Sequence, residues 1–142
     1  MKKIIFVFKI LLLIFSTSCH AQKLVHKQAD TRLLIENKSS FINKPLSVLL
    51  EQINVPIKAY YGSRTISPGG ALVFLFEPYD SVITWANRGK RAIRIRVTIK
   101  EPFESDNLNR PIKERYLWLK EDEEKYNNLR IANIAFSGMP TD

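Results

Sequence analysis

Six basic side chains fall within residues 88–100, and their spacing suggests how they are arranged. Arg94, Arg96 and Lys100 alternate with apolar residues, so on a β-strand these three cations lie on one face. Such a face can bind phosphate or carboxylate groups, which makes the three residues candidates for ligand or partner binding. The alternative is a solvated face whose charges prevent pairing with other strands. The full set is Arg88, Lys90, Arg91, Arg94, Arg96 and Lys100.

The same basic segment argues against nucleic acid as the partner. Sheets that bind single-stranded nucleic acid place aromatic side chains among their cations, because bases stack on them. No aromatic residue occurs between Trp85 and Phe103. We therefore expect no nucleic-acid binding. Attraction to anionic lipid headgroups is a further alternative, worth about 1 kcal/mol for each cation close to the surface.

Two tryptophans are the aromatic residues best suited to anchor a protein partner. Trp85 and Trp118 each have charged neighbours in the sequence, which favours partial exposure of their rings. Aromatic residues at strand spacing belong more often to the core. We include Trp118 as a candidate contact residue.

Residue types typical of catalytic sites are scarce. The two histidines, His20 and His26, precede the expected domain, and no cysteine follows Cys19. The domain therefore offers no histidine base for a nucleophilic serine, and the motifs of phosphate-binding loops, dinucleotide-binding folds and zinc proteases are missing from the sequence. We expect a protein without catalytic activity, cofactor or metal. The alternative is a small carboxylate-dependent hydrolase built on Glu101 and Glu104.

The first 21 residues have the order of a signal peptide. Lys2 and Lys3 precede an apolar stretch at 4–15 that only Lys9 interrupts, and small residues follow at 16–18. The stretch is too short to cross a bilayer, which takes roughly 20 helical residues. We therefore expect an exported protein in the periplasm or at the outer membrane. The leader holds three lysines and no acid, so its removal lowers the formal net charge from +8 to +5.

Two cleavage sites are compatible with this leader. Cleavage before Cys19 resembles the processing of bacterial lipoproteins, in which the cysteine is acylated and anchors the protein in a membrane. Ser16 stands where that pattern usually has leucine. Cleavage after Ala21 would instead release an unanchored protein that starts at Gln22. We favour the lipid anchor, because the position of the single cysteine otherwise has no evident reason.

The remainder of the chain has the length of one domain. Residues 22–40 are mostly polar and indicate a tether or a first short strand, and residues 41–138 form the expected domain. With no cysteine after Cys19, this domain contains no disulfide, and packing alone must stabilise it.

Hydrophobic spacing predicts the secondary structure of the domain. Apolar residues recur at helical spacing in 45–53 and 78–88, and the acidic segment 120–127 favours a further helical turn. Strict alternation makes 91–101 a half-buried strand, whereas the nearly all-apolar 71–76 indicates a central strand covered on both faces. The remaining strands are expected at 57–61, 116–119 and 129–136.

This order of elements predicts an α+β fold in a single small domain, preceded by the signal peptide. We expect an antiparallel or mixed sheet of about four to five strands with two helices packed on one face.

Several strings resemble a group of small exported bacterial proteins of unknown function. They are INKPLSVLLEQI, IKAYYG, VTIKEPFE and LWLKEDEEKYNNLRIANI, in that order, and the resemblance extends over about residues 40–136. The resemblance implies one intact domain and no particular activity. NKPLSVLLEQI is also similar to a helix of the short N-terminal domain of secretins and TonB-dependent receptors, which relays signals by protein contact. That similarity spans about one helix.

Together these observations predict an exported, lipid-anchored envelope protein that acts by binding, with another protein as the expected partner. Two alternatives remain: a periplasmic immunity-type inhibitor of a toxin, and the small hydrolase.

Overall fold

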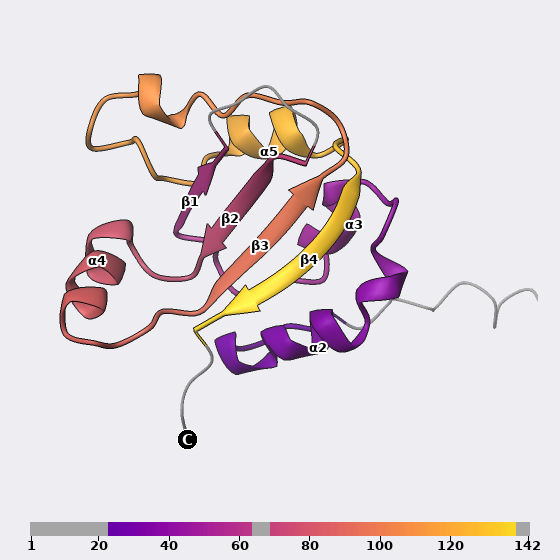
Figure 1. Cartoon of the computed structure of the whole chain (residues 1–142), viewed down its shortest axis with the longest axis horizontal. Helices are drawn as coiled ribbons and strands as arrows, with labels where there is room; N and C mark the ends of the chain where they lie inside the picture. The colour runs from indigo at the N-terminus through magenta and orange to yellow at the C-terminus, as the bar shows by residue number, and fades with distance from the viewer. Residues whose placement is uncertain (1–22, 64–68, 139–142) are drawn as a thin grey trace, which may run out of the picture.

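A computed structural model describes residues 23–63 and 69–138 of the chain. The expected signal peptide, its cleavage sites and Cys19 lie outside the described residues. Within the described part, a single antiparallel sheet has the order β1-β2-β3-β4, so each strand pairs with the next one along the chain (Figure 1). Its strands are β1 (Ala59–Gly62), β2 (Ala71–Leu75), β3 (Arg94–Ile99) and β4 (Ile131–Ser137).

Short helices accompany this sheet, and the α+β prediction is confirmed. The three predicted helical segments correspond to α3, α4 and α5. The α-helices are α2 (Arg32–Glu36), α3 (Leu46–Leu50), α4 (Tyr79–Asn87) and α5 (Lys120–Tyr126). The described residues also contain three 3-10 turns: η1 (Gln28–Thr31) before α2, η2 (Lys38–Ser40) before α3 and η3 (Asn107–Asn109) before α5.

The main core lies on the sheet face that α3 and α5 cover. Side chains alternate along β3, so Ile95, Val97 and Ile99 all enter this core. Phe74 of β2 joins them from the neighbouring strand, and Leu46 of α3 packs from outside the sheet. Figure 1 shows α3 and α5 behind the sheet, on this side.

Helix α4 packs on the opposite face, at one end of the sheet. Leu75 and Phe74 are successive strand residues, so they point to opposite faces. Val82 of α4 belongs to a second, smaller cluster with Leu75 and Ala59. The two predicted helices therefore do not share one face: α3 packs on the Phe74 side and α4 on the Leu75 side. Because β2 meets side chains on both faces, all five of its residues are buried, as its apolar sequence predicts.

The segment predicted as a tether or short strand is instead a folded part of the domain. The N–H of Val25 donates to Gln52, and Val25 and Leu34 are both completely buried. The carboxylate of Asp30 accepts hydrogen bonds from two preceding backbone N–H groups, which starts the helical turns. Three adjacent apolar residues at 33–35 are compatible with either a helix or a strand. Their packing on the sheet determines that the segment is helical.

The N-terminal segment also pairs with the end of the chain that follows α5. The N–H of Asn43 donates to the carbonyl of Ile131 at 2.8 Å, and the N–H of Ile131 donates to Lys44 at 2.9 Å. Leu46 N–H donates to the carbonyl of Leu129 at 2.8 Å. Residues 43–46 therefore run beside the start of β4.

Residues 116–119 do not form the predicted strand. The segment 112–116 is a series of turns, and one backbone hydrogen bond, from the N–H of Tyr60 to the carbonyl of Tyr116, connects it to β1. A β-strand needs several such hydrogen bonds to its neighbour, and the turns leave this segment with a single one. The long connection between β3 and α5 is held instead by side chains.

Candidate functional site

The structure spreads the three candidate cations, Arg94, Arg96 and Lys100, along β3 and just beyond its end. Arg94 begins the strand and Arg96 is exposed on the same face two residues later. Lys100 follows the strand at its far end, about 20 Å from Arg94 at strand spacing. One ligand of small size cannot touch all three residues, so Arg94 and Lys100 belong to different regions of the surface.

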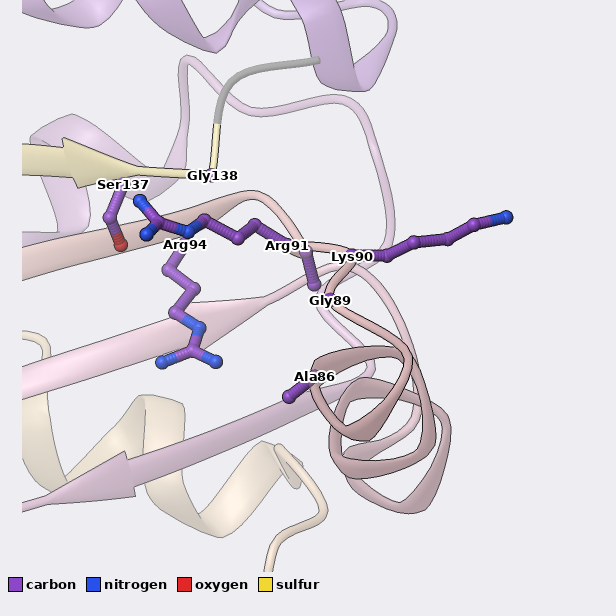
Figure 2. A pocket seen from close by; sticks show the side chains of 8 residues that line it. Ala86, Gly89, Lys90, Arg91, Arg94, Ser137 and Gly138 are labelled. Carbon is purple, nitrogen blue, oxygen red and sulfur yellow. The ribbon is translucent and has the colours of Figure 1, made fainter. Parts of the chain in front are cut away.

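Arg94 lines a pocket of about 480 Å³ between the end of α4 and the ends of β3 and β4 (Figure 2). We call it the Arg94 pocket. Two further basic residues that follow α4 contribute to its lining, and small residues make up the rest. The lining residues are Ala86, Gly89, Lys90, Arg91, Ala92, Arg94, Ser137 and Gly138.

Two glycines give the pocket its backbone shape. Gly89 has a φ of 73° and follows α4, where this left-handed conformation turns the chain toward β3. Gly138 has a φ of 83°, and a Cβ at this position would stand only 1.9 Å from the carbonyl oxygen of Ala92. The chain after β4 therefore passes directly against the segment before β3, an approach that only glycine permits.

None of the basic residues that line the pocket forms an ion pair within the described residues. Every ion pair found there, with nitrogen and oxygen within 4.0 Å, uses other basic residues. Residues 86–100 contain no aspartate or glutamate at all. Arg91 and Arg94 therefore line the pocket without an ion pair to any described acid, whereas Lys90 lies at its rim.

A second surface combines apolar exposure with stacked aromatic rings. Tyr79, the first residue of α4, stacks on Tyr116 with ring centroids 3.6 Å apart. Beside this pair, a hollow of about 310 Å³ is bordered by Ile112 and Leu117, whose exposed fractions are 81% and 42%. Burial, together with the neighbouring Tyr116, raises the pKa of Tyr79, so its hydroxyl stays protonated near neutral pH. We call this region the Ile112 surface.

Trp118 does not lie on that surface. Its ring packs edge-on against Tyr60 and Phe74, each at 5.0 Å between centroids, and stacks near Tyr126. It is a partly buried member of the main core. Because its ring packs against core aromatic residues, Trp118 is unsuited to be the exposed anchor that the sequence suggested.

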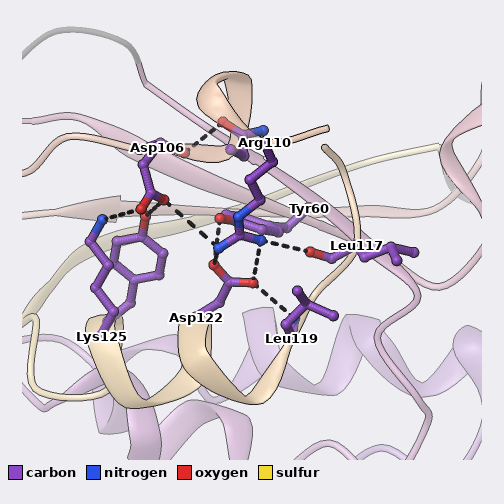
Figure 3. A network of polar contacts seen from close by, with 10 residues as sticks. Tyr60, Asp106, Arg110, Leu117, Leu119, Asp122 and Lys125 are labelled. Atoms are coloured by element: carbon purple, nitrogen blue, oxygen red, sulfur yellow. Dashed lines mark hydrogen bonds and ion pairs between the residues drawn. The ribbon is translucent and has the colours of Figure 1, made fainter. Parts of the chain in front are cut away.

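A buried polar network holds the connection between β3 and α5 (Figure 3). Asp122 is completely buried, and its carboxylate pairs with both terminal nitrogens of Arg110. It also accepts hydrogen bonds from the hydroxyl of Tyr60 at 2.7 Å and from the N–H of Leu119 at 2.8 Å. We call these four residues the Asp122 network.

The network was not visible in the sequence, where Asp122 is one of four adjacent acids. The sequence predicts a helical turn for this run but does not indicate that one of its acids is buried. Glu121, Glu123 and Glu124 are indeed exposed, but Asp122 faces inward, with Tyr126 one turn further along the same helix. Burial, reinforced by the hydrogen bond to Asp122, raises the pKa of Tyr60 well above its ordinary value.

The remaining carboxylates of this region are also engaged. Asp106 pairs with Lys125 at 2.9 Å. Burial raises the pKa of Asp106, but the hydrogen bond and charge of Lys125, together with a backbone hydrogen bond and the charge of Arg110, lower it overall. Glu101 accepts hydrogen bonds from the side chain and the backbone N–H of Arg130, which lowers the pKa of Glu101. Both oxygens of Glu101 are therefore used in a structural contact rather than aimed into a cleft with Glu104.

The described residues form neither a metal-binding cluster nor a membrane-spanning helix. In residues 23–63 and 69–138, no three histidine, cysteine, aspartate or glutamate side chains are grouped closely enough to hold a metal ion. The same ranges contain no helix with the length and apolar character needed to span a membrane.

Comparison of the chain with models of known protein families, with curated proteins and with solved structures gave no significant match. The fold class of the protein is α+β.

Proposed function

We propose that this protein is exported, is anchored to a membrane through a lipid on Cys19, and acts by binding another protein. The order of the leader supports export, and the place of the single cysteine supports the anchor. The observation that carries the binding function is the Ile112 surface, where large apolar side chains stand in solvent around a hollow.

The apolar character of this surface is concentrated rather than scattered. Single exposed apolar residues are common on proteins, but Ile112 and Leu117 border the same hollow as the stacked Tyr79. Ile83 lies one helical turn after Tyr79 on α4 and is 44% exposed, so it extends the patch along the helix. Aromatic and aliphatic side chains grouped in this way are typical of the centre of protein interfaces.

The charges near this surface indicate the chemistry of the partner. Lys113 and Arg115 also line the hollow, against a single acid, Asp80. A partner that fits would therefore present apolar side chains surrounded by acidic ones, because charge complementarity at the rim favours association. An immunity-type inhibitor would be one form of this binding function.

Site-specific crosslinking tests the interface. A photo-reactive residue at position 112 or 117 should form one discrete adduct in cells, and Ile83→Asp introduced into the same proteins should abolish it. Position 36, exposed on α2, is the matched control and should give no adduct. Equal crosslinking from positions 36 and 112, or adducts that persist with Ile83→Asp, would contradict the proposed surface.

The anchor has its own test. Mass spectrometry of the N-terminus should find a diacylglyceryl group on Cys19, and Cys19→Ser should release the protein from the membrane fraction. A mature chain that starts at Gln22 would disprove the anchor without affecting the crosslinking result.

A further inference from the structure

We propose that the Arg94 pocket binds the phosphate group of a small organic phosphate. The pocket combines cations from two different elements with a hydroxyl and a floor of small residues, and the Ile112 surface includes none of its lining residues. The two proposals are tested at different residues: Arg91 and Arg94 for the pocket, and Ile83, Ile112 and Leu117 for the protein-binding surface.

The two arginines provide the recognition. Figure 2 shows the side chain of Arg91 extending toward Ser137 and that of Arg94 turning toward the α4 side of the pocket, whereas Lys90 extends away from it. A guanidinium binds phosphate through two parallel hydrogen bonds, and its charge persists at all accessible pH values. Arg91 and Arg94 thus supply the direct contacts, and Lys90 adds a positive field at the rim.

The number of cations favours phosphate over a carboxylate. A carboxylate carries one charge and two oxygens, which one guanidinium satisfies. A phosphate monoester carries nearly two charges and three free oxygens near neutral pH, which matches two arginines and the hydroxyl of Ser137. No acid from residues 86–100 competes for these donors.

The size of the pocket indicates that the phosphate is attached to a further group. About 480 Å³ lies within the range of small-molecule sites and exceeds the volume of a single phosphate ion. Ala86, Ala92, Gly89 and Gly138 line the rest, and none of them has a side chain that fills the space. A neutral body of the size of glycerol or a sugar fits this part.

The helix C-terminus does not account for these charges. Cations after a helix stabilise its last carbonyl groups, and the position of Lys90 and Arg88 after α4 fits that role. The carbonyls of Trp85 and Ala86 already accept hydrogen bonds from the N–H groups of residues 88–90. Arg94 moreover comes from β3, and its position serves the pocket rather than the helix end.

Calorimetric titration with sn-glycerol 3-phosphate tests the proposal on the purified protein. Saturable binding is expected, with no binding of glycerol and at least tenfold weaker binding of acetate. Arg91→Ala and Arg94→Ala should each weaken the affinity for the phosphate about tenfold or more, since each removes a bidentate charged contact. Arg94→Lys keeps the charge, and it should still weaken binding because the fork of donors is lost.

Arg96→Ala is the matched control, because it removes the same charge from the same strand face outside the pocket lining. It should change the affinity less than twofold. An equal loss in Arg96→Ala and Arg94→Ala would show a general charge effect and overturn the proposal. So would the lack of saturable binding to both glycerol phosphate and lipid vesicles.

Vesicles distinguish the two sources of such a phosphate. If the ligand is a lipid headgroup, phosphatidylglycerol vesicles should bind the Cys19→Ser protein, and Arg94→Ala, but not Arg96→Ala, should reduce this binding. If the ligand is a soluble ester, glycerol phosphate binding should depend on Arg94 while vesicle binding does not. Thermal unfolding of each variant confirms that a loss of binding is not a loss of fold.

Discussion

Two arginines of this protein show how the same side chain serves opposite purposes. Arg110 is held by the buried Asp122, and its side chain is only 16% exposed. Arg94 stands in a pocket where no described acid pairs with it. Whether an arginine stabilises the protein or remains available for a ligand therefore depends on the acids that the fold places near it.

The largest expected effect comes from removing the acid of the Asp122 network. Asp122→Ala leaves the guanidinium of Arg110, the hydroxyl of Tyr60 and a backbone N–H without their common acceptor. We expect a loss of about 3–5 kcal/mol in the free energy of unfolding, measured by urea denaturation. Glu123→Ala, exposed on the same helix, should change it by less than about 0.5 kcal/mol. A loss below 1 kcal/mol for Asp122→Ala would show that water replaces the missing carboxylate.

Replacing both charged partners should cost less than replacing one. Arg110→Met and Asp122→Leu should each be strongly destabilising alone, because each leaves the other group without its partner in a buried site. In the double variant no buried charge remains, so we expect a coupling free energy of about 2–3 kcal/mol in a double-mutant cycle of denaturation experiments. Simple additivity of the two losses would mean that the pair does not act as a unit.

Tyr60→Phe removes one hydrogen bond to the same carboxylate. We expect a loss of about 2 kcal/mol in the free energy of unfolding, the usual worth of a hydrogen bond to a charged group.

The same variant should also change how stability depends on pH in alkaline solution. Because the pKa of Tyr60 is raised in the folded state, the unfolded chain loses this proton first as the pH rises above about 10, and stability then falls. In the Tyr60→Phe variant, the free energy of unfolding, measured by urea denaturation, should decrease less over the same pH range. Equal pH dependence of both proteins would show that Tyr60 is not the group responsible.

The smallest expected effect on stability is at the Arg94 pocket. Arg94→Ala should change the free energy of unfolding by less than about 0.5 kcal/mol, since no described ion pair is lost. If Arg94→Ala destabilised the protein as much as Arg110→Met does, Arg94 would be a structural residue like Arg110.

Local sequence patterns were sufficient to predict the elements whose hydrophobic spacing fits one type of secondary structure. The alternation in β3 predicted which of its residues are buried, and the unbroken apolar sequence of β2 predicted its central position. The apolar spacing of residues 78–88 predicted α4, and the helix runs within that range. Each of these signals lies within the element itself, so no distant partner is needed to interpret it.

The features that were missed depend on residues far apart in the chain. Tyr60 and Asp122 are 62 positions apart, and nothing near Asp122 distinguishes it from the exposed acids beside it. Helix α2 follows from the packing of Leu34 on the sheet, and the face that α4 covers follows from the path of the chain. The Arg94 pocket requires Gly138 to approach Ala92, a contact that no local spacing indicates.

The pairing of residues 43–46 with residues 129–131 has a consequence for biosynthesis. A ribosome must have released nearly the whole polypeptide before Asn43, Lys44 and Leu46 meet their backbone partners. Until then the early segment lacks the hydrogen bonds that position α3, although β1, β2 and β3 need only their immediate neighbours. A nascent chain halted before residue 129 should therefore leave its N-terminal third open to proteases, and completion of the last strand should protect both ends in a single step.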